Sequence, residues 1–243
     1  MSDTTPVSIA GLFVHPVKSC GRVTMDRARL IETGLEWDRE WMVVDADGEF
    51  VSQRELPRMA LVQPRLRGND MVLRAPGMLA LHVALDAVEA PRRVRVWEDT
   101  VQAYDMGDLA AQWFSDYLGR PLRLARFDPD GQRRCDAKWT GGTDALTAFA
   151  DGFPLLVLSS TAIDELNQRL AKQGRPAVDS ARFRPNIVLD GLDAHGEDFL
   201  DRLAFDTPDG PVVLRLVKPC SRCAIPDVDP ARGVPDGGRG RGR

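Results

Sequence analysis

The sequence predicts a mainly β protein with a few α-helices, an α+β fold. Short runs of β-branched and aromatic residues, separated by turn residues, fill the first hundred positions. Helical periodicity first appears near residue 108 and returns near residue 160. With 43% apolar residues in a chain of 243, the protein can bury one large core or two moderate ones without disulfides.

Strand-like runs follow one another from residue 7 to residue 104. The first three are VSIAGLFVHPV, VTMDRARLI and EWMVVDADGEFVS, and the DADG turn of the third predicts a pair of antiparallel strands. Further runs, ALVQPRL, MVLRA, LALHVAL and RRVRVWEDTVQAY, are spaced as in a β-barrel or sandwich. We therefore expect an N-terminal β-barrel-like domain over residues 1–125.

Two segments carry the pattern of amphipathic helices. The first is DLAAQWFSDYLG, with Asp108 as a plausible N-cap and Gly119 as the end. The second is SSTAIDELNQRLAKQG, which Gly174 can terminate. The apolar residues expected on one face are Leu109, Trp113, Tyr117 and Leu118 in the first helix and Ile163, Leu166 and Leu170 in the second.

The remaining segments predict a second, smaller domain. Residues 127–152 are rich in Gly and Asp and have no sustained period, which indicates a long loop or a domain junction. Strand candidates follow at NIVLD and VVLRLVK. We place a second domain at residues 126–233 and a disordered tail at residues 234–243, because GVPDGGRGRGR offers almost nothing to bury.

Charge and cysteine content exclude several classes of protein. The 32 basic and 36 acidic residues give a formal charge of -4, which argues against a nucleic-acid binder or a membrane-surface protein. No apolar run approaches the roughly 20 residues that span a bilayer. Four cysteines are too few for a disulfide framework. We expect a cytoplasmic protein in which an important thiol is a ligand or a nucleophile.

The strongest local signal is the Cys-x-x-Cys of VKPCSRCAIPDVDP. A structural zinc site needs four ligands, yet there is no second Cys pair and the three histidines are scattered. A thioredoxin-type dithiol needs a helix N-terminus, which Pro226 and Pro230 disfavour after Cys223. Two interpretations stay open: a thiolate that binds a soft metal, favoured by Lys218 and Arg222, or small residues packed at a strand end.

Other basic residues stand where strands meet turns. Lys18 and Ser19 lie in HPVKSCG, a tight loop whose hydroxyl and amides suit a phosphate. Arg39 lies between aromatic residues in EWDREW, and Arg184 precedes a proline in FRPN. Arginine's planar fork suits phosphate and the edge of a pterin. Taken singly, Lys18 and Arg39 are better explained as surface charges, and Arg184 as a partner for a nearby carboxylate.

The order of the motifs is more specific than any one of them. HPVKSCG, DREW, VSQRELPRMALVQP, LNQRL, FRPNIVLDG and CSRCAIPDVDP occur in this order between about Val7 and Gly233. The sequence thereby resembles the MOSC superfamily with its N-terminal β-barrel domain. The greatest likeness is to the mitochondrial amidoxime-reducing component and its bacterial counterparts.

The resemblance implies a set of site residues. Cys223 corresponds to the family's protein ligand to molybdenum, so that Cys220 is a neighbour and not a ligand. The other positions that the resemblance places around the pterin and its phosphate are Lys18, Ser19, Arg39, Gly152, Phe153, Arg184, Asn186, Ser221 and Arg222. Gly152 and Phe153 would approach the cofactor through their backbone, and Asn186 would support the surrounding shell.

The resemblance also implies an activity. We expect a molybdenum-molybdopterin oxidoreductase that reduces N-hydroxylated small molecules. The sequence has no four-Cys iron-sulfur spacing and no dinucleotide fingerprint, so a separate ferredoxin, flavin or haem protein would supply the electrons. The alternative is a non-catalytic module that binds the cofactor or carries sulfur, since MOSC domains also occur in cofactor-sulfurating proteins.

One departure from the family concerns the C-terminus. Relatives continue for several dozen residues beyond the VDP motif, whereas this sequence ends soon after it. We therefore expect the MOSC barrel to be incomplete, which would leave an open sheet edge and an impaired copy of the enzyme.

Overall fold

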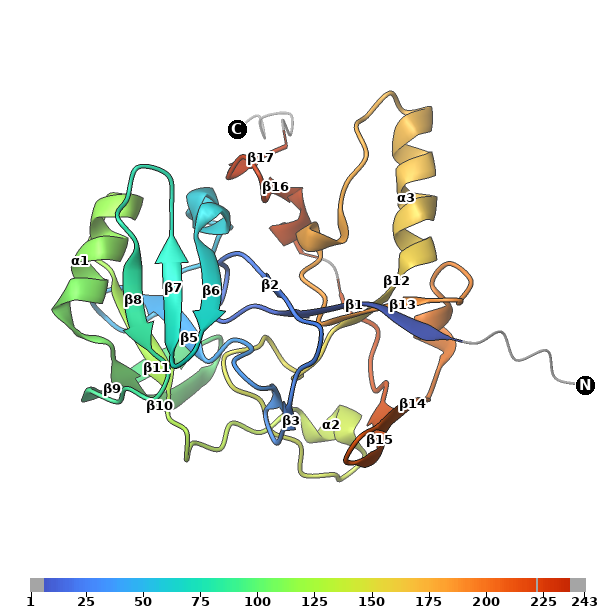
Figure 1. The fold of residues 1–243 in the computed structure, drawn as a ribbon, viewed down its shortest axis with the longest axis horizontal. Coiled ribbons are helices and arrows are strands. Elements are labelled where there is room, and N and C mark those ends of the chain that lie inside the picture. Colours follow the sequence, from blue (N-terminus) through green and yellow to red (C-terminus); the bar gives the residue numbers. More distant parts are fainter. Residues whose placement is uncertain (1–6, 222, 237–243) are drawn as a thin grey trace, which may run out of the picture.

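The computed structural model describes residues 7–221 and 223–236. Strands predominate among its elements, and the helices are few (Figure 1). This confirms the predicted mainly β fold with a few α-helices. No helix in the described ranges is long and apolar enough to cross a membrane.

One lobe, on the left of Figure 1, contains two antiparallel sheets and the first helix. The three-stranded sheet consists of β6 (Gln63–Arg67), β7 (Asp70–Arg74) and β8 (Leu81–Ala84). The four-stranded sheet has the order β5 (Trp41–Val44), β11 (Arg123–Phe127), β10 (Asp99–Asp105) and β9 (Ala90–Val96). Both sheets and α1 (Gly107–Leu118) contribute to one buried core, in which Trp41, Phe114 and Leu124 are fully enclosed.

A second four-stranded sheet joins the N-terminal segment to the second half of the chain. Its order is β12 (Val157–Ser159), β13 (Ile187–Asp190), β1 (Ser8–Val14) and β2 (Val23–Thr24). β12 and β13 are parallel and are connected through α3 (Ser160–Lys172), whereas β1 pairs antiparallel with β13. The first strand of the sequence therefore lies beside a strand of the second half. The predicted division at residue 125 stays a prediction.

Short hairpins and turns complete the molecule. The hairpins are β3 (Leu30–Ile31) with β4 (Gly34–Leu35), β14 (Arg202–Thr207) with β15 (Gly210–Arg215), and β16 (Val228–Asp229) with β17 (Val234–Pro235). A one-turn helix, α2 (Ala137–Thr140), interrupts the long loop. The 3-10 turns are η1 (Pro57–Leu61), η2 (Ser180–Arg182), η3 (Gly196–Phe199) and η4 (Ile225–Asp227).

The structure corrects details of the predicted helices. α1 begins at Gly107 with Met106 at the N-cap position, so Asp108 lies in the first turn. Leu109 is 74% exposed, whereas the buried stripe is Ala110, Trp113, Phe114 and Tyr117. These four positions have the i, i+3, i+4, i+7 spacing of one helix face, and Leu109 lies about 100° away from it. The second helix has its predicted place and ends just before Gly174.

The predicted disordered tail also needs a correction. Val234 and Pro235 form β17 and pair with Asp229 and Val228. The Gly233 amide donates to the Asp229 carbonyl at 2.8 Å, which closes the turn between the two strands. Asp236 is also described and pairs with Arg182, whereas residues 237–243 of that prediction lie outside the described residues.

Candidate functional site

Lys18 lies in the turn after β1, and its side chain is buried. Its ammonium donates to the Phe149 carbonyl at 2.7 Å and to Asp151 Oδ1 at 2.5 Å. Burial lowers the pKa of Lys18 to about 8, although the Asp151 carboxylate opposes this shift. The neighbouring Ser19 is also buried and has a positive φ of 68°. The turn thus places a buried cation close to the loop that contains Gly152 and Phe153.

Arg39 connects this turn to the second half of the chain. Its backbone φ is +52°, its Nη1 donates to Asn186 Oδ1 at 3.0 Å, and its Nη2 donates to the Arg184 carbonyl at 2.9 Å. The guanidinium also forms an ion pair with the buried Asp38. Burial alone would raise the pKa of Asp38, but the Arg39 guanidinium beside it holds it at about 2. Asp38 is therefore a permanent counter-ion inside the cluster.

The two terminal nitrogens of the Arg184 guanidinium differ in their hydrogen bonding. The backbone of Arg184 is left-handed at φ +58°, and its Nη1 donates to the Cys20 carbonyl. Its Nη2 is buried and has no hydrogen-bond partner within the described ranges. Burial lowers the pKa of Arg184 to about 10, with Arg39 contributing to the shift. A buried donor without an acceptor is costly, so this atom is suited to a ligand.

Asn186 is fully buried, and its side chain connects β1 to the segment before β12. Its Nδ2 donates to the Phe13 carbonyl at 3.2 Å, and its Oδ1 accepts from the Leu156 amide at 3.1 Å. The side chains of Lys18, Arg39, Arg184 and Asn186, with the counter-ions Asp38 and Asp151, are called the cationic cluster below. Four of the residues predicted for the site are thereby brought together.

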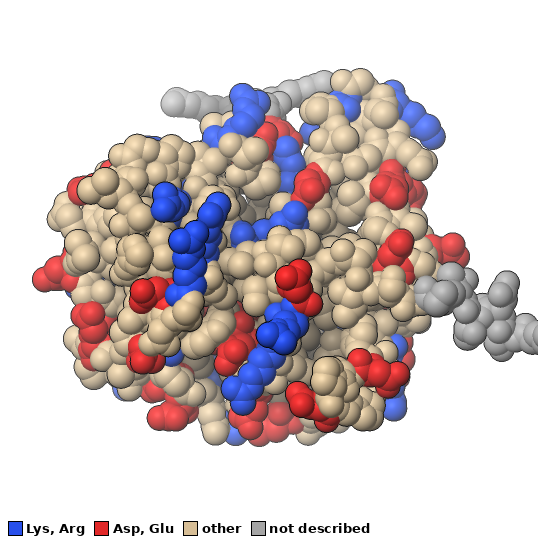
Figure 2. Space-filling view, viewed as in Figure 1, with Lys and Arg blue, Asp and Glu red and all other residues tan. Residues whose placement is uncertain are grey.

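A pocket of about 330 Å³ opens beside the cationic cluster. Figure 2 shows basic side chains gathered in the depression between the left lobe and the rest of the molecule. The pocket walls come from the segment after β1, from η1 and β6, from η2, and from the η4–β16 region. Its polar and charged lining residues are His15, Arg22, Gln53, Gln63, Asp179, Arg182 and Arg184.

The predicted metal ligand lies apart from these contacts. Cys220, Ser221 and Cys223, called the cysteine loop, follow β15 and are all exposed. Arg222 lies outside the described residues. Within the described ranges, no group of three or more His, Cys, Asp or Glu side chains could hold a metal ion. The first residue after Cys223 that lines the pocket is Ile225, two positions further along the sequence.

Among the residues that the sequence analysis missed are the two acidic partners and His15, a polar residue of the pocket wall. Asp38 and Asp151 directly precede Arg39 and Gly152, which were predicted, but nothing local identifies them as counter-ions. His15 begins the HPVKSCG motif and lines the pocket, yet it was considered only as one of the scattered histidines. The signal that was available is adjacency, because each of these residues lies in or beside a motif that contains a predicted site residue.

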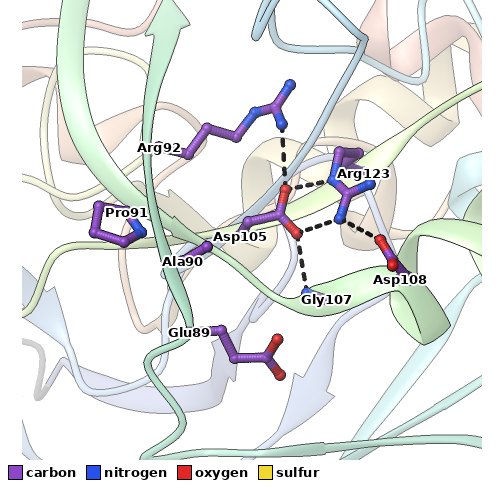
Figure 3. Close-up of a pocket in the computed structure, with 8 residues that line it drawn as sticks. All are labelled: Glu89, Ala90, Pro91, Arg92, Asp105, Gly107, Asp108 and Arg123. Atoms are coloured by element: carbon purple, nitrogen blue, oxygen red, sulfur yellow. Dashed lines mark hydrogen bonds and ion pairs between the residues drawn. The ribbon is translucent and has the colours of Figure 1, made fainter.

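A second recess, of about 430 Å³, lies at the start of α1 and contains none of the predicted residues (Figure 3). Four of its charged residues, Arg92, Asp105, Asp108 and Arg123, form one network of ion pairs. Asp105 accepts from Arg123 Nη2 at 2.8 Å, from the Gly107 amide at 2.9 Å and from Arg92 Nη1 at 3.3 Å, while Arg123 also pairs with Asp108. We interpret this recess as an ion-pair network that fixes α1 on the four-stranded sheet.

The chain is similar to known protein families over most of its length. The model of the MOSC N-terminal beta barrel domain matches residues 7–121, and the model of the MOSC domain matches residues 144–240. The mitochondrial amidoxime-reducing component 1 of Homo sapiens is 34% identical over 93% of this chain and 68% of that protein. This chain belongs to the MOSC-domain family. The resemblance inferred from the ordered motifs is thus confirmed.

Two further relatives also match nearly the whole of this chain. The mitochondrial amidoxime reducing component 2 of Bos taurus is 34% identical over 94% of this chain and 68% of that protein. The molybdenum cofactor sulfurase of Homo sapiens is 30% identical over 94% of this chain but only 27% of that protein. In this MOSC-domain protein the pocket lies between the two matched regions, because His15 and Gln63 belong to the first and Arg184 and Val228 to the second.

Proposed function

We propose that this chain binds a molybdenum-molybdopterin cofactor and reduces N-hydroxylated small molecules. The observation that carries the proposal is the buried Arg184 Nη2, which has no acceptor among the residues that the structure describes and belongs to a residue that lines a pocket with further basic residues. A pterin with a phosphate tail offers both anionic oxygens and hydrogen-bonding ring edges. The family membership and the amidoxime-reducing relatives support this choice of ligand.

The residues present fit such a group. Arg184 and Arg22 offer planar guanidinium donors to a phosphate or to a carbonyl edge, and Lys18 and Arg39 add positive charge behind them. Ser19, Ser221, Arg222, Gly152 and Phe153 are the remaining residues that we propose to border the ligand. Cys223 would provide the soft thiolate that a molybdenum ion prefers, and its exposure leaves it free to do so.

The protein and the cofactor would have separate tasks. When bound, the cofactor supplies two-electron chemistry with transfer of an oxygen atom. The chain's own residues would fix its orientation, neutralise its charge and exclude water from its buried end. We further propose that the protein is cytoplasmic and that it receives electrons from a separate ferredoxin, flavin or haem protein, because the sequence has no four-Cys iron-sulfur spacing and no dinucleotide fingerprint.

The test is a metal and activity analysis of the purified protein. Expressed in a host that makes the pterin cofactor, the chain should contain molybdenum in preference to zinc, because the described part of the chain has no cluster of side chains that would bind zinc. With a chemical reductant, the loaded protein should convert an amidoxime to the amidine. Stoichiometric zinc without molybdenum, from a host that loads other molybdoenzymes, would contradict the proposal.

A second candidate is a non-catalytic module that holds the cofactor or carries sulfur. The similarity to the molybdenum cofactor sulfurase over 94% of this chain favours it. The two candidates differ in one result. A chain that contains molybdenum and pterin but reduces no N-hydroxylated compound with any of several reductants would be the binding module.

A further inference from the structure

His15 is a buried polar residue without an evident structural task. Its side chain is only 1% exposed, and it lines the same pocket as Arg184 and Gln53. In the part of the chain that the structure describes, neither ring nitrogen of His15 has a hydrogen-bond partner. A phenyl or leucine side chain would fill this space without leaving unpaired nitrogens, so an imidazole here is unfavourable for folding.

The surroundings of His15 determine which nitrogen carries the proton. Burial, together with the nearby Arg184 and Arg39, lowers the pKa of His15 well below its usual value, so the ring is neutral at pH 7. Nδ1 lies 3.6 Å from Asp38 Oδ1, too far for a hydrogen bond but close enough to favour a proton on Nδ1. Nε2 is then left with a lone pair and acts as an acceptor.

The other side chains of the pocket mostly donate. Arg22, Arg182 and Arg184 have donors only, while Gln53 and Gln63 have amides that both donate and accept. Asp179 is the carboxylate in the wall, and it already accepts from Arg22 Nη2 at 3.1 Å and from the Ala181 amide at 2.6 Å. A phosphate ligand would need only hydrogen-bond donors from the pocket. A neutral imidazole acceptor among these donors fits a ligand that also has N–H groups, as a heterocyclic ring does.

We propose that His15 is a ligand-binding residue whose Nε2 accepts a hydrogen bond from a ring N–H of a heterocycle that Arg184 holds in this pocket. The inference rests on the proposed function, in which the heterocycle is the pterin. It also explains why a poorly satisfied side chain occupies a buried position between β1 and the Lys18 turn.

The proposal predicts opposite effects on folding and on binding. His15→Leu removes the unpaired nitrogens, so the apoprotein should unfold at the same temperature as the wild type or a higher one. The same substitution leaves the ligand N–H unpaired, so the pterin should be lost about tenfold faster during dialysis. His15→Gln keeps an acceptor and should restore most of the retention. A residue with only a structural role would not separate the two measurements in this way.

The experiment uses the full chain, with pterin measured by fluorescence after oxidative release and molybdenum measured by mass spectrometry. His82→Leu is the matched control, because His82 lies on β8 with a side chain 63% exposed and does not line the pocket. Wild-type protein that contains no pterin would overturn the proposed function and this inference together. A loaded wild type with equal retention in His15→Leu, or a His15→Leu apoprotein that unfolds at a clearly lower temperature, would overturn the inference about His15 alone.

Discussion

The cationic cluster and the cysteine loop are the two halves of the proposed cofactor site, and they differ in how they are held. Lys18, Asp38 and Asn186 of the cluster are buried, and the cluster is cross-linked by hydrogen bonds between Lys18 and Phe149, Arg39 and Asn186, and Arg184 and Cys20. The cysteine loop is exposed. The contrast indicates that the region that recognises the polar part of the ligand is preformed, whereas the thiolate takes its final position with the ligand.

The largest expected effect is on activity and comes from the cysteine loop. Cys223→Ser should lower molybdenum-dependent reduction of an amidoxime by more than about a hundredfold, because a hard hydroxyl replaces a soft thiolate. Cys220→Ser is the matched control and should keep most of the activity. Molybdenum content and turnover are measured for both variants. Equal loss in the two variants, with folding intact, would instead support a mechanism that needs both thiols.

The next effect is on stability and comes from the cationic cluster. Asp38→Asn should lower the free energy of unfolding by about 3 to 5 kcal/mol, because it removes the buried counter-ion of Arg39, whose own side chain is only 12% exposed. Urea unfolding of the apoprotein measures this loss. Asp47→Asn is a suitable control, since Asp47 lies exposed in the turn after β5. Similar stability of Asp38→Asn and Asp47→Asn would show that the cluster is not held together by its charges.

The same ion pair predicts a dependence on pH. The pKa of Asp38 falls from 3.8 to about 2 on folding, so its stabilisation is fully present above pH 3.8 and is lost as the pH falls through 2. The stability difference between the wild type and Asp38→Asn should therefore shrink by about 2 kcal/mol between pH 5 and pH 2. Urea titrations at several pH values test this. A difference that stays constant over this range would mean that Asp38 is not ionised in the folded protein.

The smallest effect sharpens the contrast between the two regions. Ser221→Ala should change the free energy of unfolding of the apoprotein by less than about 0.5 kcal/mol, because the residue is exposed. If the cysteine loop is ordered by the ligand, the same variant should unfold at a lower temperature than the wild type only when both are loaded. Differential scanning calorimetry of apo and loaded protein makes the comparison. Strong destabilisation of the apoprotein would show that the loop is already part of the folded core.

Local patterns in the sequence predicted much of the fold, but not its long-range partners. Alternating runs identified the strands around Trp41 and Ile187, and glycines marked where both main helices end. The prediction of a disordered tail was wrong at Val234, because a strand of two residues is too short to give an alternating pattern in the sequence.

The candidate site shows the same limit. Ordered motifs identified Lys18, Arg39, Arg184 and Asn186, which the structure brings together. Asp151 lies 133 residues from its partner Lys18, so that no local pattern could reveal the pair. A counter-ion is defined by the fold and not by its neighbours in the sequence, which is why the acidic members of the cluster were missed.

The pairing of β1 with β13 has a consequence for how the protein acquires its structure. Ser8 pairs with Asp190, and Asn186 donates to the Phe13 carbonyl across 173 residues of sequence. A ribosome must therefore have released most of the chain before the first strand can find its neighbour. Contacts so distant in sequence form slowly, because a long loop must close first. The lobe of β5 to β11 can therefore fold early. Until β13 is available, one edge of β1 stays unpaired and can associate with other chains.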